Sequence, residues 1–113
     1  MATLTKAEMR DRVLEHIGIL AAGQSASSED AAAVEEAIDS AHAQLRKFGL
    51  APFATSAVPE WAQPLLRDYV AGMIGASFGF GDRYVAGKML AEKELARQIA
   101  GPKQPLRTQA EYF

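Results

Sequence analysis

The sequence has no cysteine and no long uninterrupted apolar run, and each absence excludes a class of protein. Without thiols the chain forms neither a disulfide framework nor a thiolate metal site, which fits a reducing compartment. Its most apolar stretch, residues 69–81, is too short to cross a bilayer, and the charged N-terminus lacks the apolar segment of a signal peptide. We therefore expect a soluble intracellular protein.

An excess of positive charge is also lacking. The net charge is −2 and the pI is about 5.6, whereas nonspecific duplex binding requires clustered Lys and Arg. The 113 residues suffice for one domain, and their composition, 49% apolar and 23% charged, is that of a folded globular protein. The chain is thus expected to fold around one core and not to bind DNA through bulk charge.

Two helices are predicted in the first half of the chain. Thr5 and Glu8 have capping-box spacing, so a first helix is expected from Thr5 to about Ala22. Ser27 and Asp30 are placed to begin a second helix, which Gly49 should end. The apolar residues recur at helical spacing, with Met9, Val13, Ile17 and Leu20 in the first helix and Val34, Ile38, Ala41, Leu45 and Phe48 in the second.

Two further helices are predicted after a proline-rich connection. The third should start at Trp61 or Pro64 and run to about Ser77, with an apolar stripe wide enough to be buried on more than one side. Asp82 is placed to cap a fourth, which has two apolar faces and ends before 101–102. No stretch alternates as a strand would. We predict an all-α fold, a small four-helix bundle at 1–101 with an extended C-terminal tail at 102–113.

No pattern indicates catalysis, a metal site or a cofactor. His16 and His42 lie on different predicted helices without a second ligand at metal-binding spacing. The glycines at 75–81 lack the lysine and the preceding strand of a phosphate-binding loop, and no nucleophile has an orienting base nearby in sequence. An enzyme is therefore not expected, although carboxylates that meet only in the fold stay open.

A helix-turn-helix is the main alternative among binding functions, because four short helices are compatible with one. The predicted fourth helix is basic, but Lys88, Lys93 and Arg97 alternate with acidic residues, which is typical of a solvated or partner-binding surface. A small helical DNA-binding regulator remains the rival to a protein that works by assembly.

The C-terminal tail supports assembly. Ordering such a segment costs about 1 kcal/mol or more of backbone entropy per residue, so a partner surface would have to compensate. Leu106, Tyr112 and Phe113 would serve as apolar anchors, and Lys103 and Arg107 could pair with acids. A terminus without any binding role is the alternative.

The stretch from Val13 to Leu50 resembles the head-to-tail adaptor (connector) proteins of tailed bacteriophages. In that family the first helix ends in a Leu-Gly-Val-Leu-Ala-Ala-Gly phrase, similar to residues 17–23 here. A Ser-led acidic helix start and a long helix closing on Gly-Leu follow, as at 27–30 and 49–50. Later, Val58-Pro59-Glu60 and Phe78-Gly79 are similar to the family's Ile-Pro-Asp-Glu and Phe-Gly phrases, so the resemblance spans about 9–101.

The resemblance implies an all-α subunit of a homo-oligomeric ring, typically of twelve copies, beneath the portal protein in the neck of the virion. Such a ring extends the channel for double-stranded DNA without reading its sequence, helps retain packaged DNA and presents a surface for tail or stopper proteins. Subunits are made in the host cytoplasm, and the C-terminal segment commonly docks on the portal. That role would fall to Lys103, Leu106, Arg107, Tyr112 and Phe113.

A further hypothesis concerns the acidic face of the second predicted helix. Glu35, Glu36 and Asp39 follow one another at helical spacing. We expect this face to border either the DNA channel or the neighbouring subunit of the ring.

Overall fold

A computed structural model describes residues 3–21 and 23–100, and within them the chain is all-α. The α-helices are α1 (Lys6–His16), α2 (Ser28–Lys47), α3 (Gln63–Ile74) and α4 (Val85–Ala100), and the 3₁₀ helices η1 (Glu60–Ala62) and η2 (Gly75–Phe78) flank α3. The predicted four-helix bundle is confirmed. The described residues contain no strand, and their extended pairing is limited to one antiparallel bridge between Leu4 and Val58.

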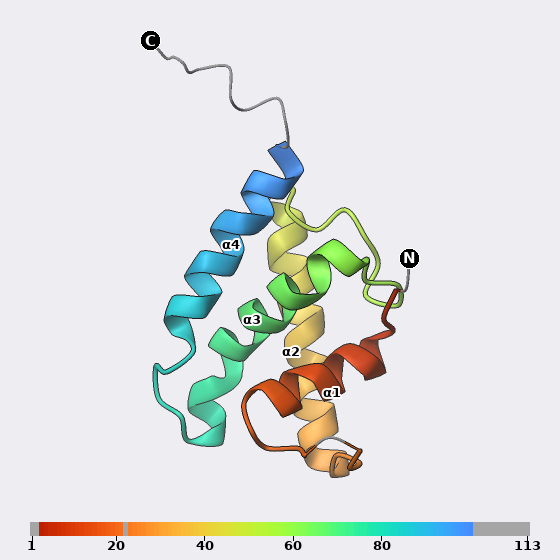
Figure 1. Cartoon of the computed structure of the whole chain (residues 1–113), viewed down its shortest axis with the longest axis vertical. Helices are drawn as coiled ribbons and strands as arrows, with labels where there is room; N and C mark the ends of the chain where they lie inside the picture. Colours follow the sequence, from red (N-terminus) through yellow and green to blue (C-terminus); the bar gives the residue numbers. More distant parts are fainter. Residues whose placement is uncertain (1–2, 22, 101–113) are drawn as a thin grey trace.

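Helix α3 lies centrally, as Figure 1 shows. α1 and α2 both pack against it and against each other, while α4 packs almost entirely on α3. The C-terminal ends of α2 and α4 lie at the same end of the molecule (Figure 1). This arrangement buries α3 between neighbours, as its wide apolar stripe predicted, and leaves α4 at the edge.

Helix α1 begins as predicted but ends earlier. The Thr5 hydroxyl accepts from the Glu8 backbone N–H at 3.2 Å, and the Glu8 carboxylate accepts from the Thr5 N–H at 2.8 Å. The expected end near Ala22 is wrong, because the helix stops at His16 and Gly18 takes a φ of +82°. That conformation suits glycine and ends the helical hydrogen bonding, yet Ile17 and Leu20 are still buried as predicted.

Helix α2 matches its predicted bounds at both ends. The Ser27 hydroxyl caps it by accepting from the Asp30 N–H, and Gly49 ends it with a φ of +73°. Val34, Ile38, Ala41 and Leu45 are buried as expected. Phe48 is the exception, because it is the residue that follows the last helical turn and 59% of its surface is exposed.

The hydrophobic core collects residues from every helix. α4 contributes Ala91 and Leu95, while Tyr69 of α3 is the largest fully buried side chain. Buried apolar residues of the core are Leu4, Met9, Val13, Leu14, Ile17, Leu20, Val34, Ala37, Ile38, Ala41, Leu45, Ala51, Val58, Ala62, Leu66, Tyr69, Val70, Ala71, Ile74, Ala91 and Leu95. Since this set forms one continuous cluster, the described residues make up a single domain.

Gly72 allows α3 and α4 to pack closely. A Cβ atom at Gly72 would collide with the Lys88 Cβ and lie 2.9 Å from the Tyr84 carbonyl oxygen. A Cβ atom at Gly75, one turn later, would lie 3.1 Å from a carbon of the Tyr84 ring. α4 was expected to start at Arg83 with Asp82 as its cap, but it starts two residues later, at Val85. The Asp82 backbone carbonyl accepts from the Val85 N–H at 3.1 Å and so closes a turn before the helix.

Candidate interaction surface

The predicted tail anchors, Lys103, Leu106, Arg107, Tyr112 and Phe113, lie outside the described residues. The boundary expected between the helical domain and the tail, at 101–102, lies there too. The predicted portal-docking role of this segment stays a prediction. The surfaces below come from the helical domain alone.

The acidic face of α2 is divided by the fold. The Glu35 carboxylate pairs with Arg10 of α1 at 2.6 Å, and Asp39 pairs with Lys6 of α1 at 3.2 Å. Arg10 also pairs with Asp11. The hydrogen bonds that its guanidinium donates to the Asp11 and Glu35 carboxylates raise the pKa of Arg10 above its usual value, and Asp11 contributes more. Glu35 and Asp39 thus bind within the chain, on the side of α2 that faces α1.

Glu36 lies apart from these two acids. It lines a groove of about 290 Å³ between α2 and the C-terminal end of α3. The other lining residues are small or apolar: Ala33, Ala37, Ser40, Met73, Ile74, Ser77 and Phe78. No side-chain partner of Glu36 occurs among the described residues. We call this surface the α2–α3 groove. Whether Glu36 borders a channel or a neighbouring subunit stays a prediction.

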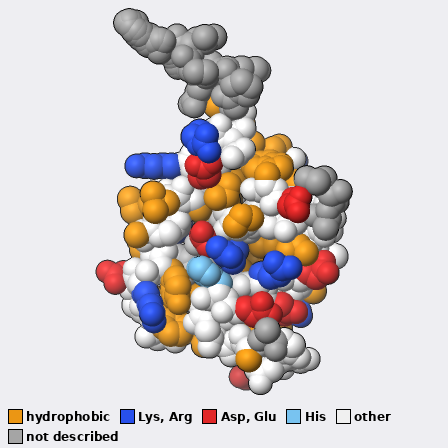
Figure 2. Space-filling model, viewed as in Figure 1, with side chains coloured by type: hydrophobic (Ala, Val, Ile, Leu, Met, Phe, Trp, Pro, Cys, Tyr) orange, Lys and Arg blue, Asp and Glu red, His pale blue; other side chains and the backbone are white. Residues whose placement is uncertain are grey.

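The outer face of α4 carries exposed apolar side chains, which is unusual for a helix in a small domain. Met89 is 59% exposed and Leu90 is 66% exposed, and Val85 and Ile99 are also exposed. In Figure 2, hydrophobic side chains gather along the edge of the molecule formed by α4. Val85 and Ile99 project well away from Leu90 around the helix, so Met89, Leu90 and Lys93, which follows them by one turn, define the α4 outer face. The sequence indicated two apolar faces on this helix, and the fold buries the one with Ala91 and Leu95.

A shallow depression of about 300 Å³ adjoins the α4 outer face. Its walls come from α4 (Met89, Glu92, Lys93 and Ala96) and from Leu50, which follows α2. Met89 and Leu90 therefore project into solvent, and the depression lies beside them. Such a surface is suited to contact with another protein and lacks the enclosure of a small-molecule site.

The charged side chains of α4 differ in what they contact. The Lys88 ammonium lies over the Tyr69 ring, 4.7 Å from its centroid, and the Arg97 guanidinium pairs with Glu94. Burial raises the pKa of the Tyr69 phenol, and the negative charge of Glu92 raises it further. Lys93 has no side-chain partner among the described residues, and it lies one turn after Met89 and Leu90. It is the unpaired cation of the α4 outer face.

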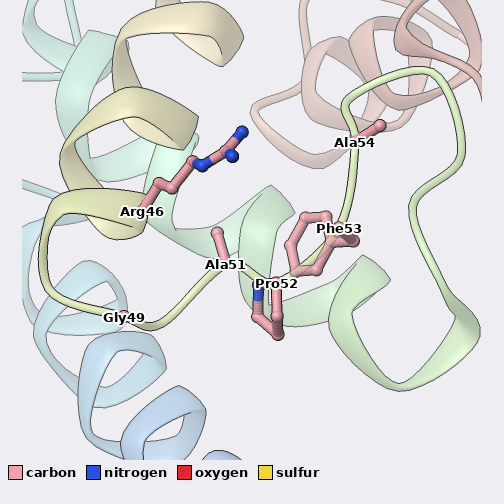
Figure 3. Close-up of a pocket in the computed structure, with 6 residues that line it drawn as sticks. All are labelled: Arg46, Gly49, Ala51, Pro52, Phe53 and Ala54. Atoms are coloured by element: carbon pink, nitrogen blue, oxygen red, sulfur yellow. The ribbon is translucent and has the colours of Figure 1, made fainter.

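A third hollow, of about 350 Å³, lies where α2 ends (Figure 3). Arg46 extends from the last turn of α2 over the following loop, and Pro52 and Phe53 form the opposite side. Gly49, Ala51 and Ala54 complete the lining. Besides the Arg46 guanidinium the lining holds no titratable or nucleophilic side chain, so this hollow lacks the groups that acid–base or covalent catalysis requires.

The two histidines lie in structural contacts on separate helices. His16 at the end of α1 lies 3.4 Å from the Asp68 carboxylate, and its ring is tilted by 53° against the Tyr84 ring, with 5.6 Å between the ring centroids. The His42 Nε2 makes a short hydrogen-bonding contact with the Phe53 carbonyl. Across residues 3–21 and 23–100, no three His, Cys, Asp or Glu side chains gather as metal ligands would.

The described helices are all too short or too polar to cross a lipid bilayer. Positive and negative side chains alternate over the face shown in Figure 2, so that face has no patch of one sign. No family model, curated protein or solved structure matches the chain.

Proposed function

We propose that the protein is a head-to-tail adaptor that performs no chemistry and works by binding copies of itself, a portal protein and a tail or stopper protein. One observation of the fold carries this proposal. The α4 outer face keeps Met89 and Leu90 more than half exposed, although the opposite face of the same helix is packed on α3. Large apolar side chains gathered on one face are typical of a protein–protein interface.

The sequence resemblance to phage adaptors supplies the specific assembly. In a ring, each subunit contacts its neighbours through two different surfaces, because head-to-tail contacts are heterologous. This domain has two candidates of that kind, the α4 outer face and the α2–α3 groove, which are lined by different residues. The ring of about twelve copies, in the virion neck, is part of this proposal.

The distribution of charge is compatible with a wall past which DNA slides. Lys6, Arg10 and Arg97 pair with carboxylates of the chain itself. Cations used in this way are less available to phosphates, and strong phosphate contacts would hold the DNA back. Double-stranded DNA is therefore proposed to pass through the ring without sequence-specific binding.

The portal is proposed to bind the C-terminal segment through Leu106, Tyr112 and Phe113, with Lys103 and Arg107 pairing with portal acids. The test is co-purification with a candidate portal protein, comparing the full chain with one truncated after Gly101. Truncation there keeps α4 whole, since α4 ends at Ala100. We expect the truncated chain to lose portal binding and to keep its far-UV circular dichroism.

Two matched full-length variants test whether the aromatic side chains of the tail are the anchors. Tyr112→Ala with Phe113→Ala should weaken portal binding strongly, whereas Gln104→Ala with Thr108→Ala, in the same segment, should leave it unchanged. Equal portal binding by the full and truncated chains would show that the tail has no docking role.

Titration of the chain with a short DNA duplex distinguishes the adaptor from the rival proposal, a helical DNA-binding regulator. An adaptor should show no measurable affinity for a short duplex at low salt, whereas a regulator should bind with an affinity that falls steeply as salt rises. Salt-dependent binding by the folded chain would favour the regulator.

A further inference from the structure

Two unpaired charges of opposite sign lie on the two candidate contact surfaces. Glu36 lines the α2–α3 groove and Lys93 lies on the α4 outer face, and neither has a side-chain partner among the described residues. Several other ions of these helices are held within the chain, as in the pairs of Glu35 with Arg10 and Glu94 with Arg97. Glu92 lies beside Lys93 in the same depression, so the two surfaces offer one complementary pair of charges, Lys93 and Glu36.

The same surfaces also have opposite relief. The α4 outer face projects Met89 and Leu90, which are the most exposed apolar side chains of this helix, and Lys93 follows them by one helical turn. The α2–α3 groove is a hollow of about 290 Å³, with Met73 and Phe78 among its apolar lining. A ridge with a cation at its edge thus corresponds to a groove with an anion at its edge.

These two surfaces belong to one chain, so the partner that fits each of them is another copy. We propose that Met89 and Leu90 of one copy seat in the α2–α3 groove of a second copy, where Lys93 pairs with Glu36. This inference deepens the proposed function, on which it rests for the ring, by naming the two surfaces that meet.

The apolar contact should provide most of the affinity, and the ion pair should set which surfaces meet. Burial of Met89 and Leu90 removes apolar area from water, while complementary charge across an interface favours the correct partner and orientation. Because the contact joins different surfaces, the first pair of copies keeps one α4 outer face and one α2–α3 groove free. Assembly therefore continues from copy to copy, and it ends in a ring where the rotation between neighbours closes, as the proposed function requires.

The test is sedimentation equilibrium of the full chain and of two charge-reversal variants, Glu36→Lys and Lys93→Glu. Each variant alone places like charges in every contact, so its association should weaken about tenfold or more. An equimolar mixture of the two should associate as the wild type does. In the mixture each groove can meet a ridge of opposite charge when the variants alternate. Glu15→Lys, the same charge change on α1, is the control and should associate normally.

Failure of this proposal is distinct from failure of the adaptor role. A wild-type chain that stays monomeric up to roughly 1 mM, where association would be negligible, overturns the self-contact. So do variants that associate normally, or a mixture that is no better than its components. Portal co-purification by the same variants measures the adaptor role separately, and it should persist in each of them because the proposed portal contact uses residues 103–113.

Discussion

Gly72 limits the distance between α3 and α4, and this makes it a sensitive position. Because a Cβ there meets the Lys88 Cβ and the Tyr84 carbonyl, Gly72→Ala should force α4 outward. We expect a loss of about 1–3 kcal/mol in the free energy of unfolding, as in other overpacked sites. Urea unfolding followed by circular dichroism measures it.

Gly87→Ala is the matched control for that substitution. Gly87 lies within α4, and a Cβ there meets nothing within 4 Å. Alanine favours helix over glycine by about 1 kcal/mol, so this variant should be as stable as the wild type or more so. If Gly72→Ala were equally harmless, the close approach of the two helices would not restrict this site.

His16 makes stability depend on pH. Burial, followed by the charge of Arg67, lowers the pKa of the His16 imidazole below its ordinary value of 6.5, although Asp68 opposes the shift. The unfolded chain then binds the proton more tightly than the folded one, so stability is highest above pH 6.5 and falls as the pH drops through and below that value. Thermal unfolding should therefore give a lower melting temperature at pH 5.5 than at pH 7.5, and His16→Gln should reduce this difference. An identical pH dependence in the variant would assign the effect to other groups.

Among the elements, α1 depends on its N-terminal cap. Thr5→Ala removes the hydroxyl that accepts from the Glu8 N–H, and we expect a cost of about 0.5–2 kcal/mol in unfolding free energy. Thr5→Ser should keep the cap, and Thr3→Ala, two residues earlier and exposed, should have no effect. A neutral Thr5→Ala would mean that packing alone holds the start of α1.

Local patterns predicted the helices well where a cap or a glycine marks the boundary. Thr5, Ser27 and Gly49 fix three boundaries by hydrogen bonds and backbone conformation within a few residues. The end of α1 was wrong because Ile17 and Leu20 continue the apolar spacing after the helix has ended. Burial alone does not distinguish a helix from the turn that follows it.

The contact surfaces could be predicted only in part, because they depend on how the helices pack. The sequence indicates two apolar faces on α4, but only the packing of α4 on α3 shows that the face with Ala91 and Leu95 is the buried one. The sequence also places Glu35, Glu36 and Asp39 on one helix. It does not show that α1 brings Arg10 to Glu35 and Lys6 to Asp39. The unpaired Glu36 became apparent only from that packing.

For the molecule as a whole, folding and assembly use different parts of α4. Leu95 is fully buried, whereas Met89 and Leu90 are mostly exposed. Substitution of the exposed pair should therefore alter contacts between copies while leaving the domain folded. Substitution of Leu95 should instead lower the stability of the domain, because it removes packing from the core.

Exposed and buried side chains of α4 should therefore affect different measurements. Met89→Gln with Leu90→Gln should leave the unfolding free energy of the dilute monomer within about 0.5 kcal/mol of the wild type, whereas Leu95→Ala should cost about 2–5 kcal/mol. Self-association stabilises the folded state by mass action, so the wild-type melting temperature should rise with protein concentration and that of the double variant should not. Calorimetry over a hundredfold range of concentration measures both. A double variant whose melting temperature still rises like that of the wild type would show that copies meet through some other surface.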